Sequence, residues 1–119
     1  MIFLVDDDPI QNMLTSKLIE TYDDKLQYKV YQNGEEALEA IKSRIYPDII
    51  LLDINMPIMD GWEFLEAYES VKKKAKVFML TSSNMSDDRN RAADFDCVLG
   101  YYTKPINLHD IKDVLAENL

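Results

Sequence analysis

Short apolar runs, separated by segments of helical character, are the feature that most constrains how this chain folds. The runs at residues 2–5, 48–52 and 77–80 are almost continuously apolar, which is typical of strands covered on both faces of a sheet. The run at 26–31 mostly alternates between apolar and polar residues and predicts a half-exposed edge strand. A mixed run at 98–102 predicts the opposite edge. The sequence therefore predicts five strands, with the three buried ones in the middle.

Helical patterns occupy the segments between and after these runs. Residues 86–95 are only weakly amphipathic and are expected to form a short helix. Asp8 (before Pro9), Asn33 and Asn107 are expected to cap the first, second and last helices. The other four segments carry apolar residues at helical spacing, namely Ile10, Met13, Leu14 and Leu18; Leu38, Ile41 and Ile45; Phe64, Leu65 and Tyr68; and Leu108, Ile111 and Leu115.

Five strands that alternate with five helices are typical of an open parallel α/β sheet. Buried strands belong in the centre and an alternating strand at an edge, which favours the flavodoxin-like order 2-1-3-4-5. The 119 residues fit a single domain, which we expect to cover residues 1–119. In such sheets ligands bind outside the carboxyl ends of the strands, so we look for a functional site there.

Composition limits the classes of partner and the location. The chain has 22 acidic and 13 basic residues and a formal charge of −9, so we expect no direct binding of nucleic acid, whose phosphates such a domain repels. No apolar run approaches the roughly 18–20 residues that span a bilayer, so membrane insertion is not expected. The single cysteine, Cys97, cannot form an internal disulfide and fits a cytoplasmic location.

Polar residues follow several of the predicted strands at the point where each strand ends. Asp6 and Asp7 follow the first strand, Asp53 the third, Thr81 the fourth, and Lys104 comes shortly after the fifth. Converging carboxylates repel one another, and a hard divalent cation such as Mg²⁺ resolves that conflict. Singly, these residues also fit simpler roles, such as solvated loop acids or an ordinary surface charge. Asp53 is the exception, because a carboxylate directly after a buried strand needs a partner or a function.

These blocks of residues resemble the receiver domains of two-component response regulators, over essentially the whole chain. The resemblance rests on Asp6-Asp7, the stretch DINMPIMDG at 53–61, Thr81-Ser82 and Lys104-Pro105, in that order. Residues 94–97 read DFDC where many receivers carry a Gly-Ala pair. This departure affects the expected output face but leaves the phosphorylation site untouched.

The resemblance implies that the domain is a phosphorylated switch and not an enzyme that turns over a substrate. Asp53 would accept a phosphoryl group from a sensor histidine kinase or a histidine phosphotransfer protein, and a downstream protein would read the result. The helix 4–strand 5–helix 5 surface would change on phosphorylation. The implied site comprises Asp6, Asp7, Asp53 and the Asn55 carbonyl for Mg²⁺; Thr81, the Ser82 N–H and Lys104 for the phosphoryl group; and Thr81 and Tyr101 for the switch.

The resemblance also implies three local features. The Lys104-Pro105 peptide bond is expected to be cis, and Gly61 is expected to have positive φ. Asn55 and Ser83 are expected to flank the path of the water that hydrolyses the phosphate.

Three other functions remain open. In a phosphatase of the haloacid dehalogenase type, Asp6 would be the nucleophile and Asp8 the acid/base. A flavodoxin-like electron carrier would bind the phosphate of FMN at the first loop, which the acids at 6–8 would repel. A binding module that no longer takes phosphate would leave Asp7, Asp53, Thr81 and Lys104 without a role.

Overall fold

A computed structural model describes residues 1–72, 74–82, 90–116 and 118. Their five parallel strands form one sheet in the order β2-β1-β3-β4-β5. The predicted flavodoxin-like topology is therefore confirmed. The elements are β1 (Ile2–Val5), α1 (Pro9–Tyr22), β2 (Tyr28–Tyr31), α2 (Gly34–Lys42), β3 (Ile49–Asp53), α3 (Gly61–Tyr68), β4 (Lys76–Thr81), β5 (Val98–Thr103) and α5 (Leu108–Ala116).

The expected fourth helix can be followed only in part. Residues 90–92 are helical, whereas most of the predicted segment 86–95 lies outside the described residues or in turns. Within the described residues, the helices are too short and too polar for any of them to cross a membrane.

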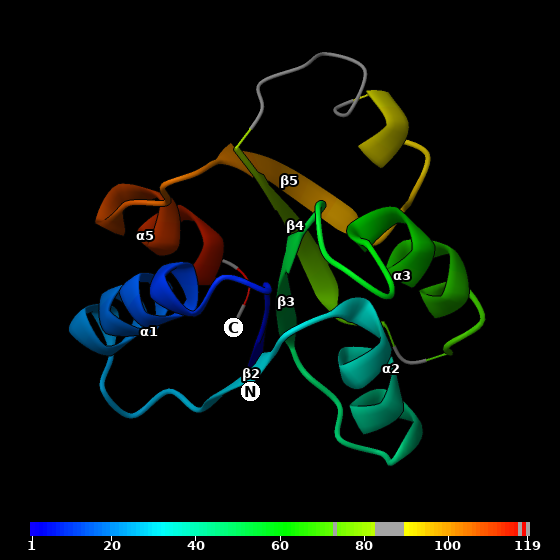
Figure 1. The fold of residues 1–119 in the computed structure, drawn as a ribbon. Coiled ribbons are helices and arrows are strands. Elements are labelled where there is room, and N and C mark those ends of the chain that lie inside the picture. Colours follow the sequence, from blue (N-terminus) through cyan, green and yellow to red (C-terminus); the bar gives the residue numbers. More distant parts are fainter. Residues whose placement is uncertain (73, 83–89, 117, 119) are drawn as a thin grey trace.

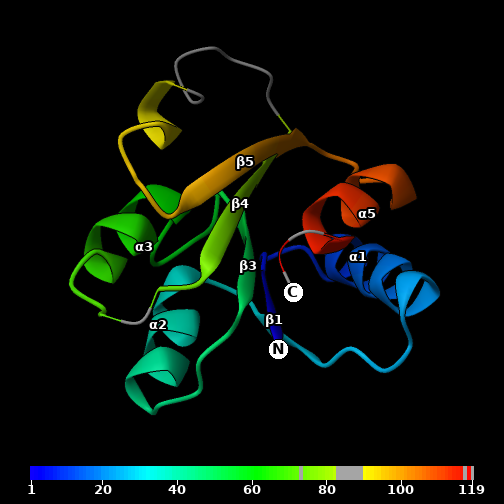
Figure 2. The same cartoon turned by 180° about the vertical axis from the view of Figure 1, so that it is seen from behind.

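The sheet separates two apolar clusters, one on each face. Figures 1 and 2 show α2 and α3 on one side of the strands and α1 and α5 on the other. Because successive side chains of a strand point to opposite faces, Phe3 packs toward α2 and α3 whereas Ile2 and Leu4 pack toward α1 and α5. Both faces of β1, β3 and β4 are thereby covered, as their continuous apolar runs predicted.

Helix α1 leaves most of its predicted apolar stripe exposed, although Leu18 packs against the core. Ile10 and Met13 are 65% and 49% exposed, whereas Asn12 and Ile19 are buried. The Asn12 side-chain amide donates a hydrogen bond of 2.8 Å to the backbone carbonyl of Asp6. This bond turns a polar face of the helix toward the end of β1. Periodicity located the helix correctly but not the face that it buries.

Side-chain caps fix where the helices begin. The predicted caps are confirmed, since Asp8 accepts from the N–H of Ile10, Asn33 from that of Glu36 and Asn107 from that of Asp110. Helix α3 begins with a capping box between Asp60 and Glu63, which the apolar pattern did not reveal.

Gly61 is required for close approach and not for an unusual backbone angle. Glycines with positive φ are absent from the described residues, so the expectation for Gly61 is wrong. A Cβ at this position would lie 2.6 Å from the backbone oxygen of Asp53 and 3.0 Å from the Cα of Ile54. Gly61 thus lets α3 begin against the end of β3. In the same loop, positive φ falls on Ile58, at 68°.

Helix α2 ends in a Schellman motif whose left-handed residue is Arg44, with φ of 68°. The N–H of Arg44 bonds to the Ile41 carbonyl at 2.9 Å, and that of Ile45 to the Ala40 carbonyl at 3.0 Å. Glycine adopts this backbone conformation without the steric cost that Arg incurs.

We expect Arg44→Gly to stabilise the protein by about 0.5–1 kcal/mol, because it relieves that cost without removing a buried contact. Lys42→Gly is the matched control, because Lys42 lies two residues earlier, within the same helix, and is also exposed. It should destabilise by about 1 kcal/mol. Urea unfolding of both variants measures the difference, and equal effects would contradict the assignment.

Candidate functional site

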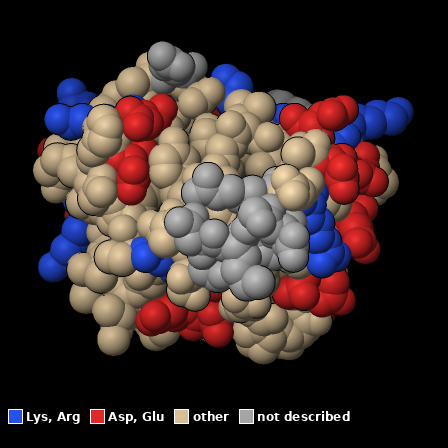
Figure 3. All heavy atoms as spheres, turned by 90° about the horizontal axis from the view of Figure 1, so that it is seen from above, with Lys and Arg blue, Asp and Glu red and all other residues tan. Residues whose placement is uncertain are grey.

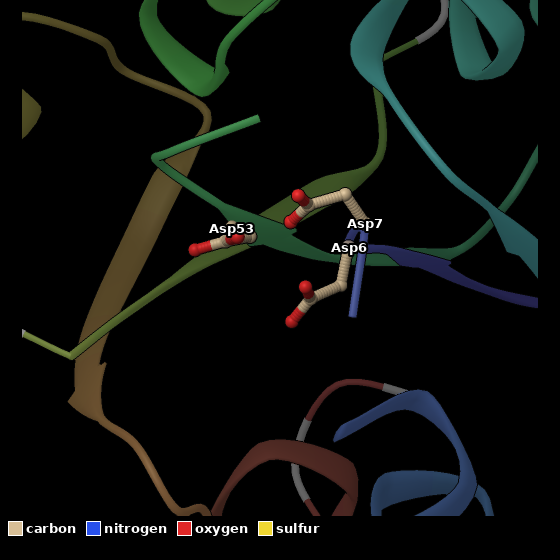
Figure 4. A group of neighbouring side chains, drawn as sticks. All are labelled: Asp6, Asp7 and Asp53. Carbon is tan, nitrogen blue, oxygen red and sulfur yellow. The ribbon is translucent and has the colours of Figure 1, made fainter. Parts of the chain in front are cut away.

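Three carboxylates meet where β1 and β3 end. Asp6 and Asp7 follow β1 directly, and Asp53 is the last residue of β3. The two strands are hydrogen-bonded neighbours, so their ends are adjacent, and Figure 4 shows the three side chains together there. One oxygen from each carboxylate lies within 4.8 Å of the others. Asp6 and Asp53 are buried and Asp7 is exposed.

Lys104 reaches the same place from the loop after β5. Its Nζ lies 2.6 Å from Asp6 Oδ2 and 3.2 Å from Asp53 Oδ1. Its backbone N–H donates to the carbonyl of Thr81 at the end of β4, and the Lys104-Pro105 bond is cis, as expected. Lys104 is therefore held between two buried carboxylates by a loop that is tied to the neighbouring strand.

Asp6 is engaged through both of its carboxylate oxygens. Oδ1 accepts a hydrogen bond of 3.0 Å from the N–H of Asp8, and Oδ2 accepts from Lys104. Its backbone carbonyl accepts from Asn12. Asp6 thus orients its neighbours and is less available than Asp7 to bind another group directly.

Burial raises the pKa of Asp53 to about 6, and repulsion from the Asp6 carboxylate adds to the shift. Lys104 opposes it by charge attraction and by its hydrogen bond. Burial also lowers the pKa of Lys104, but the hydrogen bond to Asp6 and the charge of Asp53 outweigh it, so this pKa lies above its ordinary value. The site thus combines one partly buried ammonium with three neighbouring carboxyl groups.

This donor set fits a hard divalent cation. Mg²⁺ prefers oxygen ligands and uses one or two carboxylates together with carbonyls and water. Asp7 and Asp53 offer carboxylate oxygens within reach of each other, and the exposed Asn55 lines the same cavity. A cation there would offset the repulsion that raises the pKa of Asp53.

Most of the predicted site residues line one open cavity. Thr81 is an exception, since it is buried at the end of β4. Tyr101 is half-buried on β5 and packs against the cluster beneath α2 and α3. Ser83 lies outside the described residues. The cavity is lined by Asp6, Asp7, Asp8, Gln11, Asp53, Asn55, Ser82, Lys104 and Pro105.

Gln11 is the residue of this cavity that the sequence analysis missed. In the receiver interpretation Asp8 was expected only to cap a helix, yet it also lines the cavity, and its N–H donates to Asp6. The signal for Gln11 was present, because an N-cap at Asp8 places residue 11 in the first turn of a helix that begins beside the acids. The sequence could not show that Gln11 and Lys104 line the same cavity, since the two residues are far apart in the chain.

Burial, and not mere abundance of acid, distinguishes this cluster. Asp and Glu side chains form several separate groups on the face shown in Figure 3, with Lys and Arg among them. Exposed acids of that kind keep a surface soluble and need no further partner. Asp6 and Asp53, in contrast, are 3% and 5% exposed.

The sequence of this chain is similar to those of known proteins. A family model described as response regulator receiver domain matches residues 2–116. The nitrate/nitrite response regulator protein NarL of Escherichia coli is 31% identical over 120 residues, which cover 98% of this chain and 53% of that protein. The chemotaxis protein CheY of Halobacterium salinarum is 26% identical, with 99% and 95% covered.

Solved structures of response regulators have the same fold as this chain. A two-component response regulator from Cytophaga hutchinsonii superposes with a TM-score of 0.88 at 27% identity, over 98% of this chain and 93% of that one. The chain spans about half the length of NarL and of the probable transcriptional regulator ycf29 of Porphyra purpurea, to which it is 32% identical. The buried acids, their lysine and the sheet that places them thus have a common explanation: this chain belongs to the receiver domain family of two-component response regulators.

Proposed function

We propose that residues 1–119 form a single switch domain in which Asp53 accepts a phosphoryl group. The observation that carries this proposal is the setting of Asp53, a buried carboxylate 3.2 Å from Lys104 and beside the oxygens of Asp6 and Asp7. Buried acids in so crowded a place are costly unless their charge is used. The family of the chain supports the same role.

In the transfer, a carboxylate oxygen of Asp53 forms a bond to phosphorus. The bond between phosphorus and the imidazole nitrogen of the donor phosphohistidine breaks, and that nitrogen keeps the electron pair. Such transfers depend mainly on alignment and on neutralising charge at the phosphoryl oxygens. Lys104 and the backbone N–H of Ser82 supply donors at the cavity, and Thr81 supplies a hydroxyl at the end of β4.

Mg²⁺ is the proposed cofactor. Asp7, Asp53 and the backbone carbonyl of Asn55 would hold it directly, and Asp6 through water, in keeping with the engagement of both Asp6 oxygens. When bound, it would supply positive charge that neutralises the transferring oxygens.

The proposed output is a change of packing near β5. Thr81 and Tyr101 lie on the adjacent strands β4 and β5, so movement of Thr81 toward a phosphoryl group would alter the space that the Tyr101 ring occupies. The helix 4–strand 5–helix 5 surface would then change its affinity for a downstream protein.

The donor is proposed to be a sensor histidine kinase or a histidine phosphotransfer protein in the cytoplasm, and the domain itself is not proposed to turn over a substrate. Two relatives, the hybrid signal transduction histidine kinases E and G of Dictyostelium discoideum, are named as kinases, and this chain matches 7% and 3% of their lengths.

The phosphatase alternative is disfavoured by Asp6. A nucleophilic carboxylate needs an oxygen that is open to phosphorus, whereas both oxygens of Asp6 accept hydrogen bonds from within the chain. An electron carrier is disfavoured by the three acids at the loop where the phosphate of FMN would sit.

The proposal is tested by incubating the protein with Mg²⁺ and acetyl phosphate and following its intact mass. We expect one phosphoryl group to be added per chain. A chelator added before the donor should prevent this labelling. Peptide mapping after borohydride reduction should locate the group at Asp53. Labelling at Asp6, or labelling that persists without divalent cations, would contradict it.

Mg²⁺ should also raise the melting temperature, because a ligand that binds only the folded state stabilises it. At about 100 times its Kd the gain is about 2.7 kcal/mol. Asp7→Asn should lose most of this gain, whereas Asp24→Asn, at an exposed acid outside the cavity, should keep it. Differential scanning calorimetry with and without Mg²⁺ makes the comparison, and an equal gain in both variants would exclude Asp7 as a ligand.

A further inference from the structure

Gln11 places an amide in the wall of the cavity that holds Asp53, and this amide N–H has no hydrogen-bond partner among the described residues. The side chain lines the cavity that holds Asp53, Lys104 and Ser82. Its Nε2 is enclosed, and no acceptor for it exists among the described residues. Buried polar groups in folded proteins are nearly always paired, so an enclosed N–H donor without an acceptor calls for an explanation.

The usual role of a glutamine at this position is already taken. With Asp8 as N-cap, Gln11 is the third residue of helix α1, from which a Gln or Glu normally accepts the N–H of the cap residue. Here the N–H of Asp8 donates to Asp6 Oδ1 instead, at 3.0 Å. The capping box is therefore not made, and the Gln11 amide is left for another purpose.

The backbone around Gln11 is held firmly. Its own N–H donates to Asp8, and the next residue, Asn12, bonds to the Asp6 carbonyl at 2.8 Å. These bonds fix the first turn of α1 against the acid cluster. The Gln11 side chain is thus presented to the cavity by the same residues that orient Asp6.

We propose that Gln11 is a further phosphoryl-contacting residue, whose amide donates a hydrogen bond to an oxygen of the group transferred to Asp53. The inference rests on the proposed function. The transferred group brings anionic oxygen acceptors into a cavity where the Gln11 donor bonds to no acceptor of the described residues. A hydrogen bond to a charged acceptor is stronger than one between neutral groups. Gln11 makes and breaks no covalent bond. It adds an uncharged donor to those of Lys104 and Ser82.

The test compares Gln11→Met with Gln27→Met. Methionine resembles glutamine in length and lacks the amide, and Gln27 is an exposed glutamine outside the cavity. We expect Gln11→Met to be phosphorylated by acetyl phosphate about 10- to 100-fold more slowly than wild type, the range for one hydrogen bond to a charged group. Its affinity for beryllofluoride, an uncleaved mimic of the phosphoryl group, should fall by a similar factor in calorimetric titrations. Gln27→Met should match wild type in both.

A merely structural role of Gln11 predicts a lower melting temperature for Gln11→Met and an unchanged rate of phosphorylation. Under the proposal, in contrast, loss of an unpaired buried N–H should leave the melting temperature of Gln11→Met unchanged or raise it, and Mg²⁺ binding should be retained. Gln11→Glu keeps the shape, removes the donors and adds a negative charge, so its phosphorylation should be slower still.

Wild-type rates and wild-type beryllofluoride affinity in Gln11→Met would overturn the inference while leaving the proposed function intact. A wild-type protein that takes no phosphoryl group would remove the proposed function itself.

Discussion

Asp53→Asn is expected to abolish phosphorylation and, in the absence of divalent cations, to make the protein more stable at pH 7. Asparagine cannot attack phosphorus, so no stable phosphorylated species forms. It is also uncharged, so it avoids the cost of burying a charge and the repulsion from Asp6, the two effects that raise the pKa of Asp53 to about 6. Because a shift of one pKa unit corresponds to about 1.36 kcal/mol, we expect a gain of about 1–3 kcal/mol.

The gain should depend on pH in a defined direction. The folded-state pKa of Asp53 lies above its ordinary value of 3.8, so its burial costs nothing while it is protonated in both states. The cost appears as pH rises through that ordinary value and is complete once pH exceeds the folded-state pKa. The difference in stability between Asp53→Asn and wild type should therefore be small at pH 4 and largest at pH 7.

Urea unfolding at both pH values, with a chelator present, measures this difference. Asp24→Asn is the control, since Asp24 is exposed and lies outside the cavity. With saturating Mg²⁺ the order should reverse, because only the wild-type site keeps both carboxylates proposed to bind the metal directly. A destabilised Asp53→Asn at pH 7 without metal would mean that Lys104 more than compensates for the burial of Asp53.

Lys104→Met is expected to have the opposite effect on stability and a large effect on phosphorylation. Removing one partner of a buried ion pair leaves the other charges uncompensated, which costs about 3–5 kcal/mol. Here Asp6 and Asp53 would lose the ammonium that lies 2.6 and 3.2 Å from them. Phosphorylation should slow by about 10²–10³-fold, as for the loss of one donor to a developing negative charge.

Two comparisons separate the loss of the Lys104 ammonium from non-specific destabilisation. Lys112→Met removes an exposed lysine of α5 and should change neither quantity. The double variant Lys104→Met/Asp53→Asn should be more stable than Lys104→Met, because one of the uncompensated acids is gone. An equal gain from Asp53→Asn in wild type and in Lys104→Met would show that Asp53 and Lys104 are not energetically coupled.

Sequence patterns predicted the sheet because each pattern records a local requirement. The runs at 2–5 and 77–80 are apolar at every position since both faces of their strands are covered. The edge position of β2 followed from its alternation, and the helix starts at Asp8, Asn33 and Asn107 followed from the chemistry of capping. The gathering of acids followed too, because the ends of neighbouring parallel strands meet at one edge of the sheet.

Other features required contacts between distant parts of the chain. The apolar stripe of α1 indicated a helix, but the bond from Asn12 to Asp6 decided which face it buries. Gly61 was expected to supply an unusual backbone angle, whereas its role is to let backbone approach backbone. Neither hydrogen bonds of this kind nor close approaches leave a periodic trace in the sequence.

For the acids at 6, 7 and 53, the sequence by itself determined that they would meet, because strand order and strand ends are fixed by local patterns of burial. Only the tertiary structure decided how they are used. It engages Asp6 through Lys104, 98 residues away, and through Asp8. It also encloses the Gln11 amide in the same cavity wall, where that amide has no acceptor within the described part of the chain. The physical reason is that hydrogen bonds between side chains depend on positions within an ångström, which folding sets and residue order does not.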